Sequence, residues 1–392
     1  MTDTLFLAMA YLRHHRVKSA VMVLALATIL AVPATVSALI EAAQARLSAR
    51  AAATPLVIGA PGSRLDLVLA ALHFDAALPE PTTQAAVDAV WASGLADAVP
   101  LHLGFGTGPH PIVGTSLDYF DLRGLEIAEG RGLALLGEAV IGAGVAEREG
   151  LGPGGRLISN PETLFDLAGS YPLALDIVGV LAPSGTDDDR AVFVDIKTAW
   201  VIAGIGHGHA AVVQTSPPGE TPDAPLRADP AILEFTEITP ETIDSFHFHG
   251  DPSDYPVTAV IARPYDTRAG TLLRGRYLDG EAGQQAVVPA AVIDGLIAQV
   301  FRIKGVLDLV VALVTVAALA GLGLALFLSL QLRSGEMATA FRLGAPRLHV
   351  ARLVGAEALI LLLAAGFIAF CLAALAQNFA ADAVDRLIRP TP

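Results

Sequence analysis

Three long apolar runs constrain this chain more than any other feature. They span residues 19–40, 306–330 and 353–376. As helices rising 1.5 Å per residue, runs of this length cross about 30 Å of bilayer hydrocarbon. Only 16% of all residues are charged, against about 25% in soluble proteins, and the apolar runs explain the difference. We therefore expect an α-helical membrane protein with three transmembrane helices.

The first run admits a second interpretation, as the core of a secretory signal peptide followed by small residues up to Ala53. The run is longer than a typical signal-peptide core, and the chain contains two further spans. We therefore favour a retained helix, with a kink at Pro33 that membrane helices tolerate. Residues 41–53 are expected to extend this helix as a stalk, which Pro55 ends.

Basic residues beside the runs predict the orientation in an inner membrane. Residues 1–18, expected to form a cytoplasmic amphipathic helix, are basic near the first run, and residues 331–352 carry four arginines and one acid. Positively charged flanks stay in the cytoplasm. Residues 41–304 and the tail 377–392 are then extracytoplasmic, so the N-terminus is inside and the C-terminus outside. Arg302 and Lys304, on the outer side of the second run, are the exceptions to this pattern.

The segment between the first two runs is expected to form a mixed α/β domain, as one large or two small units. Helical patterns cover Thr83–Ala98 and Gly144–Glu149, and the Pro-rich acidic stretch Ser216–Pro230 is the expected break. Strands are predicted where short runs rich in Val and Ile lie between turn residues. These runs are PLVIG, HPIVGTS, EAVIGAG, DIVGVL, RAVFVDI, YPVTAVIA and QQAVVPA.

The charge of this segment excludes nucleic acid as a partner. Residues 41–304 contain 16 Lys and Arg against 33 Asp and Glu, a difference of 16 − 33 = −17, while the whole chain carries −14. Nucleic-acid phosphates require neutralising positive charge, which this domain lacks. Its charge suits cationic ligands, although solubility alone is the simpler explanation.

Four motifs lie outside or beside the apolar runs: LAMAYLRHHRVKS (7–19), VGTSLDYFDLRGLEIAEGR (113–131), EAVIGAGVAEREGLGPGGRL (138–157) and SGEMATAFRLGAPRLHVARLVGAEALIL (334–361). They resemble segments of the FtsX/MacB-like permeases of ABC transporters, the mechanotransmission (type VII) permeases. The plan is also similar: one helix, a large MacB-like periplasmic domain, then the remaining helices.

This resemblance implies a non-catalytic membrane subunit that is driven by a separate cytoplasmic ABC ATPase. It also implies a homodimer in membrane lipid, with a periplasmic carrier or an outer-membrane protein as a further partner. Family permeases have a fourth span near the C-terminus. Here the sequence ends at Pro392, so we expect either that this branch lacks the span or that the sequence is truncated.

The last motif contains the segment that couples such permeases to their ATPase. The resemblance assigns this role to Glu336, Arg342, Gly344 and Ala345. The residues themselves predict a short helix from Glu336 to Leu343, with Gly344 suited to its C-terminal cap. The alternative is an ordinary charged loop that follows the positive-inside rule.

Two H-x-H pairs, His207/His209 and His247/His249, are candidate metal ligands. Residues two apart on a strand share a face, so each pair offers two imidazoles, and zinc in the outer domain is the candidate cofactor. Asp244 and Asp251, or the Gly-rich stretch with His102 and His110, are possible additions to the site. The alternative is solvated surface histidines.

Two further patterns are weaker. The acids Asp187–Asp189 suggest a calcium loop, but a solvated turn is the favoured interpretation. The glycines of Gly104–Gly108 lack the Lys-Ser/Thr that follows them in a phosphate-binding loop. Since no catalytic constellation is found either, we expect no enzyme activity in this chain.

Three functions are compatible with the sequence. The first is a permease subunit that transports or extracts a substrate, for which a metal-related compound is the candidate, driven by ATP hydrolysis in its partner. The alternative is an FtsX-like scaffold that activates a cell-wall hydrolase without transport. A membrane-anchored binding protein that has lost ATPase coupling is the third.

Overall fold

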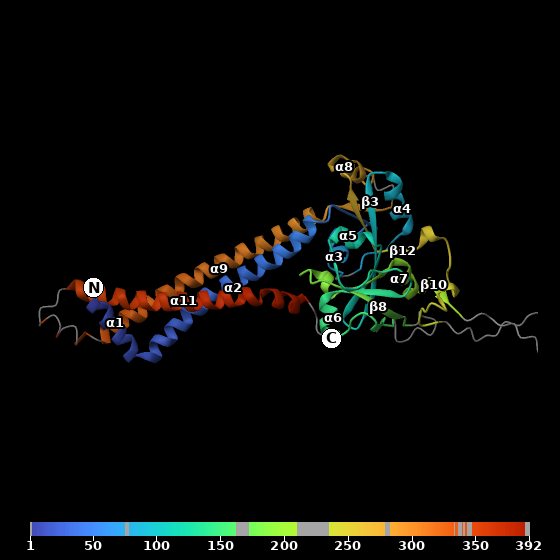
Figure 1. Ribbon diagram of the computed structural model, residues 1–392. Coiled ribbons are helices and arrows are strands. Elements are labelled where there is room, and N and C mark those ends of the chain that lie inside the picture. The colour runs from blue at the N-terminus through green and yellow to red at the C-terminus, as the bar shows by residue number, and fades with distance from the viewer. Residues whose placement is uncertain are drawn as a thin grey trace, which may run out of the picture. The chain divides into compact units, whose positions relative to one another are not determined.

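The computed structural model describes residues 2–74, 78–161, 172–209, 235–278 and 283–388, apart from 333, 336–338, 340–341 and 343–346. The chain divides into two compact units. The helical unit comprises Met1–Ser48 and Asp294–Pro392, and the α/β domain comprises Ala49–Ile293. Figure 1 shows the helices of the first and the sheet of the second.

Four helices are described for the helical unit: α1 (Thr2–His14), α2 (Arg16–Ala52), α9 (Pro289–Leu332) and α11 (Arg347–Ile388). Three of them, α2, α9 and α11, contain stretches long and apolar enough to cross a membrane. Leu26 and Ala27 of α2 are buried with Leu322 of α9 and Leu361 of α11. These three helices therefore pack on one another through a small apolar core.

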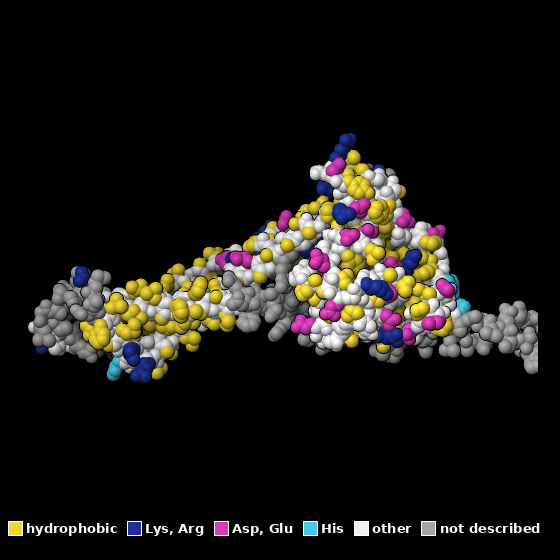
Figure 2. All heavy atoms as spheres, in the orientation of Figure 1, with side chains coloured by type: hydrophobic (Ala, Val, Ile, Leu, Met, Phe, Trp, Pro, Cys, Tyr) yellow, Lys and Arg dark blue, Asp and Glu magenta, His cyan; other side chains and the backbone are white. Residues whose placement is uncertain are grey.

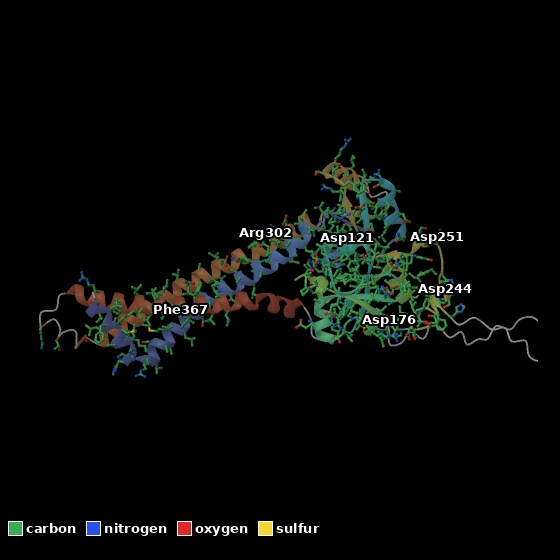
Figure 3. All side chains as sticks on the ribbon, in the orientation of Figure 1. Asp121, Asp176, Asp244, Asp251, Arg302 and Phe367 are labelled. Atoms are coloured by element: carbon green, nitrogen blue, oxygen red, sulfur yellow. The ribbon has the colours of Figure 1, made fainter. Side chains whose placement is uncertain are left out.

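Large apolar side chains cover the outer surface of these helices (Figure 2). Leu313 is 71% exposed, and Phe367, labelled in Figure 3, is 70% exposed. Continuous apolar surface of this extent is rare on soluble proteins and marks contact with another phase or partner. The apolar helices are thus suited to contact lipid, as an α-helical membrane protein requires.

The α/β domain is built on a ten-stranded mixed sheet. Its strand order is β14-β1-β13-β3-β4-β9-β6-β8-β5, with β7 paired to β8. Two small sheets, β10–β11 and β12–β2, accompany it. The strands are β1 (Leu56–Gly59), β2 (Thr82–Thr83), β3 (Ala96–Thr107), β4 (His110–Thr115), β5 (Ile127–Gly130), β6 (Glu138–Ile141), β7 (Arg156–Ile158), β8 (Ala174–Leu181), β9 (Val192–Asp195), β10 (Gly206–Gly208), β11 (Phe246–Phe248), β12 (Pro256–Val257), β13 (Ala259–Pro264) and β14 (Gln285–Val287).

Short helices cover the sheet: α3 (Arg64–His73), α4 (Gln84–Ser93), α5 (Asp118–Arg123), α6 (Ala143–Glu149), α7 (Ile196–Ile202) and α8 (Thr267–Gly275), with 3₁₀ turns η1 (Asp187–Arg190), η2 (Ile243–Ser245) and η3 (Pro252–Asp254). Helix α7 contributes to two apolar cores. Trp200 packs with β1, β3 and β13, whereas Ala199 and Ile202 pack with β6, β8 and β9. This helix therefore joins the two halves of the sheet.

The expected mixed α/β domain is present, and each of the seven predicted strand segments contains a strand. The helix predicted over Thr83–Ala98 is too long. It ends at Ser93, because Gly94 adopts the left-handed conformation (φ 63°) that closes a helix, and β3 begins at Ala96. The expected break at Ser216–Pro230 lies outside the described residues, and both apolar cores belong to one compact unit.

Candidate functional site

Both long connecting helices join the α/β domain through neighbouring strands. Helix α2 ends at Ala52, shortly before β1 begins, and β14 ends directly before α9 begins at Pro289. The two strands pair antiparallel, with Val57 opposite Val287. A movement of either helix would thus act on the same edge of the sheet.

The last turn of α2 carries a buried arginine, Arg50. Its Nη1 donates to Oδ2 of Asp188 at 2.6 Å, and its Nη2 donates to Oδ1 at 2.9 Å. The Tyr119 hydroxyl accepts from Arg50 Nη2 at 3.0 Å and donates to Asp188 Oδ1 at 2.7 Å. The Arg50 and Asp188 side chains are only 7% and 2% exposed. Two-pronged pairing of this kind fixes both position and orientation.

Charge compensation keeps this site ionised despite its burial. Burial alone would raise the pKa of Asp188, but the hydrogen bond and positive charge of Arg50 hold it below its ordinary value. Burial raises the pKa of the Tyr119 hydroxyl, so it stays protonated and can donate. The guanidinium also lies over the Phe74 ring, 5.5 Å from its centroid.

Further hydrogen bonds tie the end of α2 to helix α5. Thr54 Oγ1 donates to the Arg50 carbonyl at 2.9 Å and accepts from Arg123 Nη1 at 2.8 Å. We refer to Arg50, Thr54, Tyr119, Arg123 and Asp188 as the Arg50 network. It connects the C-terminal turn of α2 with α5 and η1 inside the α/β domain.

The sequence motifs explain how η1 comes to this position. Tyr119 belongs to the motif at residues 113–131, and Gly142 to the motif at residues 138–157. A Cβ atom on Gly142 would lie 2.3 Å from the Asp188 carbonyl oxygen. Only glycine therefore allows η1 to approach α6 so closely. The sequence singled out these motifs but gave no signal that Arg50 pairs with Asp188.

The interpretation of Asp187–Asp189 as a solvated turn was wrong. Asp188 is 1% exposed, and Asp187 pairs with His73 Nδ1 at 2.5 Å and with Arg190 Nε at 3.1 Å. Asp189 accepts from the backbone amides of Ser184 and Gly185 at 2.8 Å. All three carboxylates thus hold η1 in place, and this accounts for their presence without calcium.

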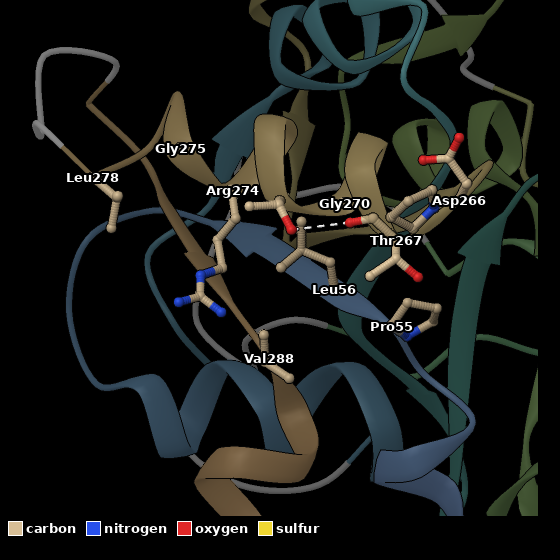
Figure 4. Close-up of a pocket in the computed structure, with 11 residues that line it drawn as sticks. Pro55, Leu56, Asp266, Thr267, Gly270, Arg274, Gly275, Leu278 and Val288 are labelled. Carbon is tan, nitrogen blue, oxygen red and sulfur yellow. Dashed lines mark hydrogen bonds between the residues drawn. The ribbon is translucent and has the colours of Figure 1, made fainter.

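A pocket of about 450 Å³ lies where β1 and β14 meet the connecting helices (Figure 4). Pro55 and Val288, one from each connection, line it together with the α8 residues Thr267 and Arg274. Within α8, the Thr271 hydroxyl donates to the Thr267 carbonyl at 2.9 Å. None of the residues expected to form a site lies in this pocket.

The four histidines of the two H-x-H pairs come together on the two-stranded β10–β11 sheet. His207 lies directly opposite His247, with ring centroids 4.8 Å apart. His249 lies 4.8 Å from His207 and 4.9 Å from His247, and His209 lies 5.1 Å from His247. The ligand atoms of His207, His247 and His249 all lie within 4.8 Å of one another. The pairs, about 40 residues apart in sequence, therefore form one cluster.

Strand alternation places these imidazoles on one face. On the opposite face, the Phe248 ring covers Gly206 and the Phe246 ring covers Gly208, so closely that a Cβ on either glycine would lie 2.6 Å from a ring carbon. Both phenylalanines pack against the apolar core. The pattern Gly-His-Gly-His against Phe-His-Phe-His thus fixes which face carries the histidines.

The cluster lies at the surface of the domain. Figure 2 shows histidine and acidic side chains at the edge where Figure 1 places β10, and Figure 3 shows Asp244 at the same edge. Asp251 does not join the cluster; it caps η3 by accepting from the Ser253 amide at 3.0 Å.

The other expected histidines lie elsewhere. His102 is on β3, is 6% exposed, and has no hydrogen-bond partner for either ring nitrogen in the described part of the chain. Burial lowers its pKa to about 4. His110 on β4 bonds Glu149 through Nε2 at 2.9 Å. Both histidines are buried within the α/β domain and do not join the histidine cluster on β10 and β11.

Of the expected coupling residues, Arg342 is helical and exposed. Glu336, Gly344 and Ala345 lie outside the described residues. The structure therefore does not test the coupling segment.

Comparison with known proteins identifies the family. Residues 19–225 match the family model of the MacB-like periplasmic core domain, which is more than half of the 392-residue chain. The chain belongs to this family and is a MacB/FtsX-like permease-type protein of the ABC transporter class.

Two solved structures of domains from ABC-type transporters show a weak similarity to this chain. The periplasmic region of MacB from Actinobacillus actinomycetemcomitans is 12% identical with a TM-score of 0.34; the match covers 62% of this chain and 92% of that chain. The extracellular domain of the noncanonic ABC-type transporter YknZ from Gram-positive bacteria is 12% identical with a TM-score of 0.33, covering 60% and 99%. The family assignment rests on the family model alone. Among curated proteins, none matches this chain.

Proposed function

We propose that this chain is the permease subunit of an ABC transporter whose ATP hydrolysis takes place in a separate cytoplasmic ATPase. Nucleotide-driven movement of the ATPase tilts the membrane helices, and α2 and α9 carry this movement to the α/β domain, which acts on a substrate outside the membrane. Two copies of the chain would work with two ATPase subunits. The chain itself is not expected to catalyse a reaction.

The Arg50 network is the observation that best supports this proposal. A flexible linker between span and domain would absorb movement, whereas here the last turn of α2 is held by a buried ion pair and hydrogen bonds. In the second connection, on the strand paired with β1, only Val288 separates β14 from α9. Both connections are short and ordered, as mechanical transmission requires.

ATPase recruitment is tested by co-purification. The full-length chain, carrying an affinity tag, is solubilised in mild detergent from its own cells, and bound proteins are identified by mass spectrometry. We expect an ABC ATPase with the parent chain and its loss with the double variant Glu336→Lys/Gly344→Trp, since both changes fall in the coupling segment. The matched control Arg302→Gln, outside that segment, should retain the ATPase.

Failure to recover an ATPase, even after mild crosslinking, would contradict the proposal that the chain is a transporter subunit. Recovery of a cell-wall hydrolase in its place would support the FtsX-like scaffold. A periplasmic carrier or an outer-membrane protein recovered with the ATPase would support transport or extraction and would name the further partner.

We propose an inner-membrane location with the N-terminus and residues 331–352 in the cytoplasm and the α/β domain outside. Single cysteines introduced into a Cys371→Ser background test this. A membrane-impermeant maleimide should label Leu278→Cys, at a site 73% exposed in the α/β domain, in intact spheroplasts. It should label Arg342→Cys only after permeabilisation; the reverse pattern would invert the topology.

For the substrate, we propose one related to metal, as either a free ion or a metal-loaded carrier. Two features support this class of substrate, because both favour cation binding. They are the excess of acidic residues in the segment 41–304 and the histidine cluster on the β10–β11 sheet. Metal-dependent stimulation of the partner ATPase in reconstituted vesicles would test it, and equal ATPase rates with and without metal would argue for another substrate.

A further inference from the structure

We infer that the histidine-bearing face of the two-stranded β10–β11 sheet is a binding site for a divalent transition-metal ion of the zinc type, with His207, His247 and His249 as ligands. His209 is the candidate fourth ligand, since its ring lies 5.8 Å from that of His207 and 5.1 Å from that of His247. The inference concerns the ion itself and does not depend on ATPase coupling.

The ligand geometry is close to what such an ion requires. Zn–N bonds of about 2.0–2.1 Å place the nitrogens of a tetrahedral site about 3.3 Å apart. The three ligand atoms already lie within 4.8 Å of one another without an ion. The rings project from one face of the same small sheet, so changes in χ1 and χ2, with the backbone unmoved, are the adjustment that would bring the ligand atoms to this separation.

One hydrogen bond prepares His247 to act as a ligand. Its Nδ1 lies 3.0 Å from the carbonyl oxygen of Ser245. A carbonyl oxygen can only accept, so Nδ1 carries the proton and the lone pair is on Nε2. A backbone carbonyl that fixes the tautomer and the ring in this way is the usual outer partner of metal-binding histidines.

Backbone pairing between β10 and β11 sets the positions of the candidate ligands. His207 and His247 face each other across the sheet, and the His249 amide donates to the Ile205 carbonyl at 3.1 Å, which extends the pairing by one step. Phe246 and Phe248 pack the opposite face of this two-stranded sheet against the core. The spacing of the imidazoles is thus set by the sheet and not by a loose loop.

The chemistry of the ligand set selects the ion. Imidazole nitrogens suit zinc, copper and nickel, whereas calcium and magnesium prefer oxygen ligands. The ligands are neutral, so the ion keeps its full charge, and the acidic excess of the domain attracts it. Solvated, metal-free histidines are the competing explanation, and the following experiment separates the two.

The experiment measures metal binding to the full-length chain in detergent, purified with a tag that contains no histidine. Zn²⁺ binding is followed by competition with a chromogenic chelator, and Co²⁺ absorption reports the coordination number. We expect about one ion per chain and a four-coordinate Co²⁺ spectrum. Removing one ligand, as in His249→Asn, should weaken binding by at least about tenfold, and His207→Asn/His247→Asn should abolish it.

The matched control is His14→Asn/His15→Asn, which removes two exposed, adjacent histidines at the C-terminal end of α1 and just beyond it and should leave binding unchanged. The fluorescence melting curve of each variant shows whether the α/β domain remains folded. If the double variant is unfolded, His249→Asn decides the question alone, because that side chain is exposed. Binding of equal affinity in the parent and His249→Asn, or equal loss in the control, would overturn the inference. Failure of ATPase recovery would leave this result unaffected.

Discussion

Replacing Arg50 by methionine should strongly destabilise the α/β domain. The change keeps most of the apolar stem but removes the guanidinium that neutralises Asp188. Among the described residues, the carboxylate then keeps the Tyr119 and Thr186 hydroxyls as hydrogen-bond donors, at 2.7 and 2.8 Å. Its side chain is only 2% exposed. Removing one partner of a buried ion pair costs about 3–5 kcal/mol. For a domain of this size, that lowers Tm by roughly 6–20 °C.

Tryptophan fluorescence measures this change selectively, because Trp91 and Trp200, the chain's two tryptophans, are both in the α/β domain. The matched control is Arg263→Met, whose partner is Asp97 in an arginine-carboxylate pair at 2.7 Å with the arginine 50% exposed. Exposed pairs contribute about 0–1 kcal/mol, so this variant should melt nearly with the parent.

The double variant Arg50→Met/Asp188→Leu refines the test. It replaces the pair by apolar side chains, and such replacements of buried pairs are often neutral or stabilising. We therefore expect it to recover much of the stability lost in Arg50→Met. Equal melting of Arg50→Met and Arg263→Met would refute the reasoning, since it would show that the buried pair contributes no more than an exposed one.

Three further predictions follow from single residues. His102→Leu should make the protein less sensitive to acid. The pKa of His102 is lowered to about 4 in the folded state and is about 6.5 in the unfolded state, so the free energy of unfolding falls by up to about 3 kcal/mol as pH falls from 6.5 to 4. The variant lacks this loss, and urea unfolding of parent and variant at several pH values measures the difference. Gly142→Ala places a Cβ 2.3 Å from a backbone oxygen of η1 and should cost about 1–3 kcal/mol, whereas Gly132→Ala, with open space at its Cβ, should change stability by less than about 0.5 kcal/mol. Cys371, exposed on α11, should react with an apolar maleimide in membranes and not with a charged, water-soluble one; efficient reaction with the charged reagent would place this residue in water.

Local patterns predicted half of the fourteen described strands but not the longest. Runs rich in Val and Ile identified β1, β4, β6, β8, β9, β13 and β14, because these buried strands consist of such residues. Strand β3 was missed, since its second half contains glycines and reads as a loop. Gly104 lies at an irregularity of the β3–β4 ladder with φ 114°, a conformation that glycine accepts readily.

The candidate sites differ in how many of their residues could be predicted from the sequence. The two H-x-H pairs were visible as pairs, but their union depends on the pairing of β10 with β11, which no local pattern encodes. Arg50 and Asp188 are separated by 138 positions. The sequence showed only that Asp188 lies among acidic residues, a pattern typical of a solvated turn. In the structure Asp188 is buried, so the pattern was misinterpreted. Long-range pairing was therefore the missing information in both cases.

Transmission through α2 is the central claim, and nucleotide-dependent movement of the α/β domain tests it most directly. A spin label at Leu278→Cys, in a Cys371→Ser chain reconstituted with its ATPase, reports the distance between the two copies by pulsed electron resonance. We predict that ATP trapping shifts this distance in the parent and in the Arg263→Gln control, and that Arg50→Lys, which keeps the charge but loses the two-pronged bond, reduces the shift while ATPase binding persists. The same distance with and without nucleotide in the parent, or an undiminished shift in Arg50→Lys, would contradict the account.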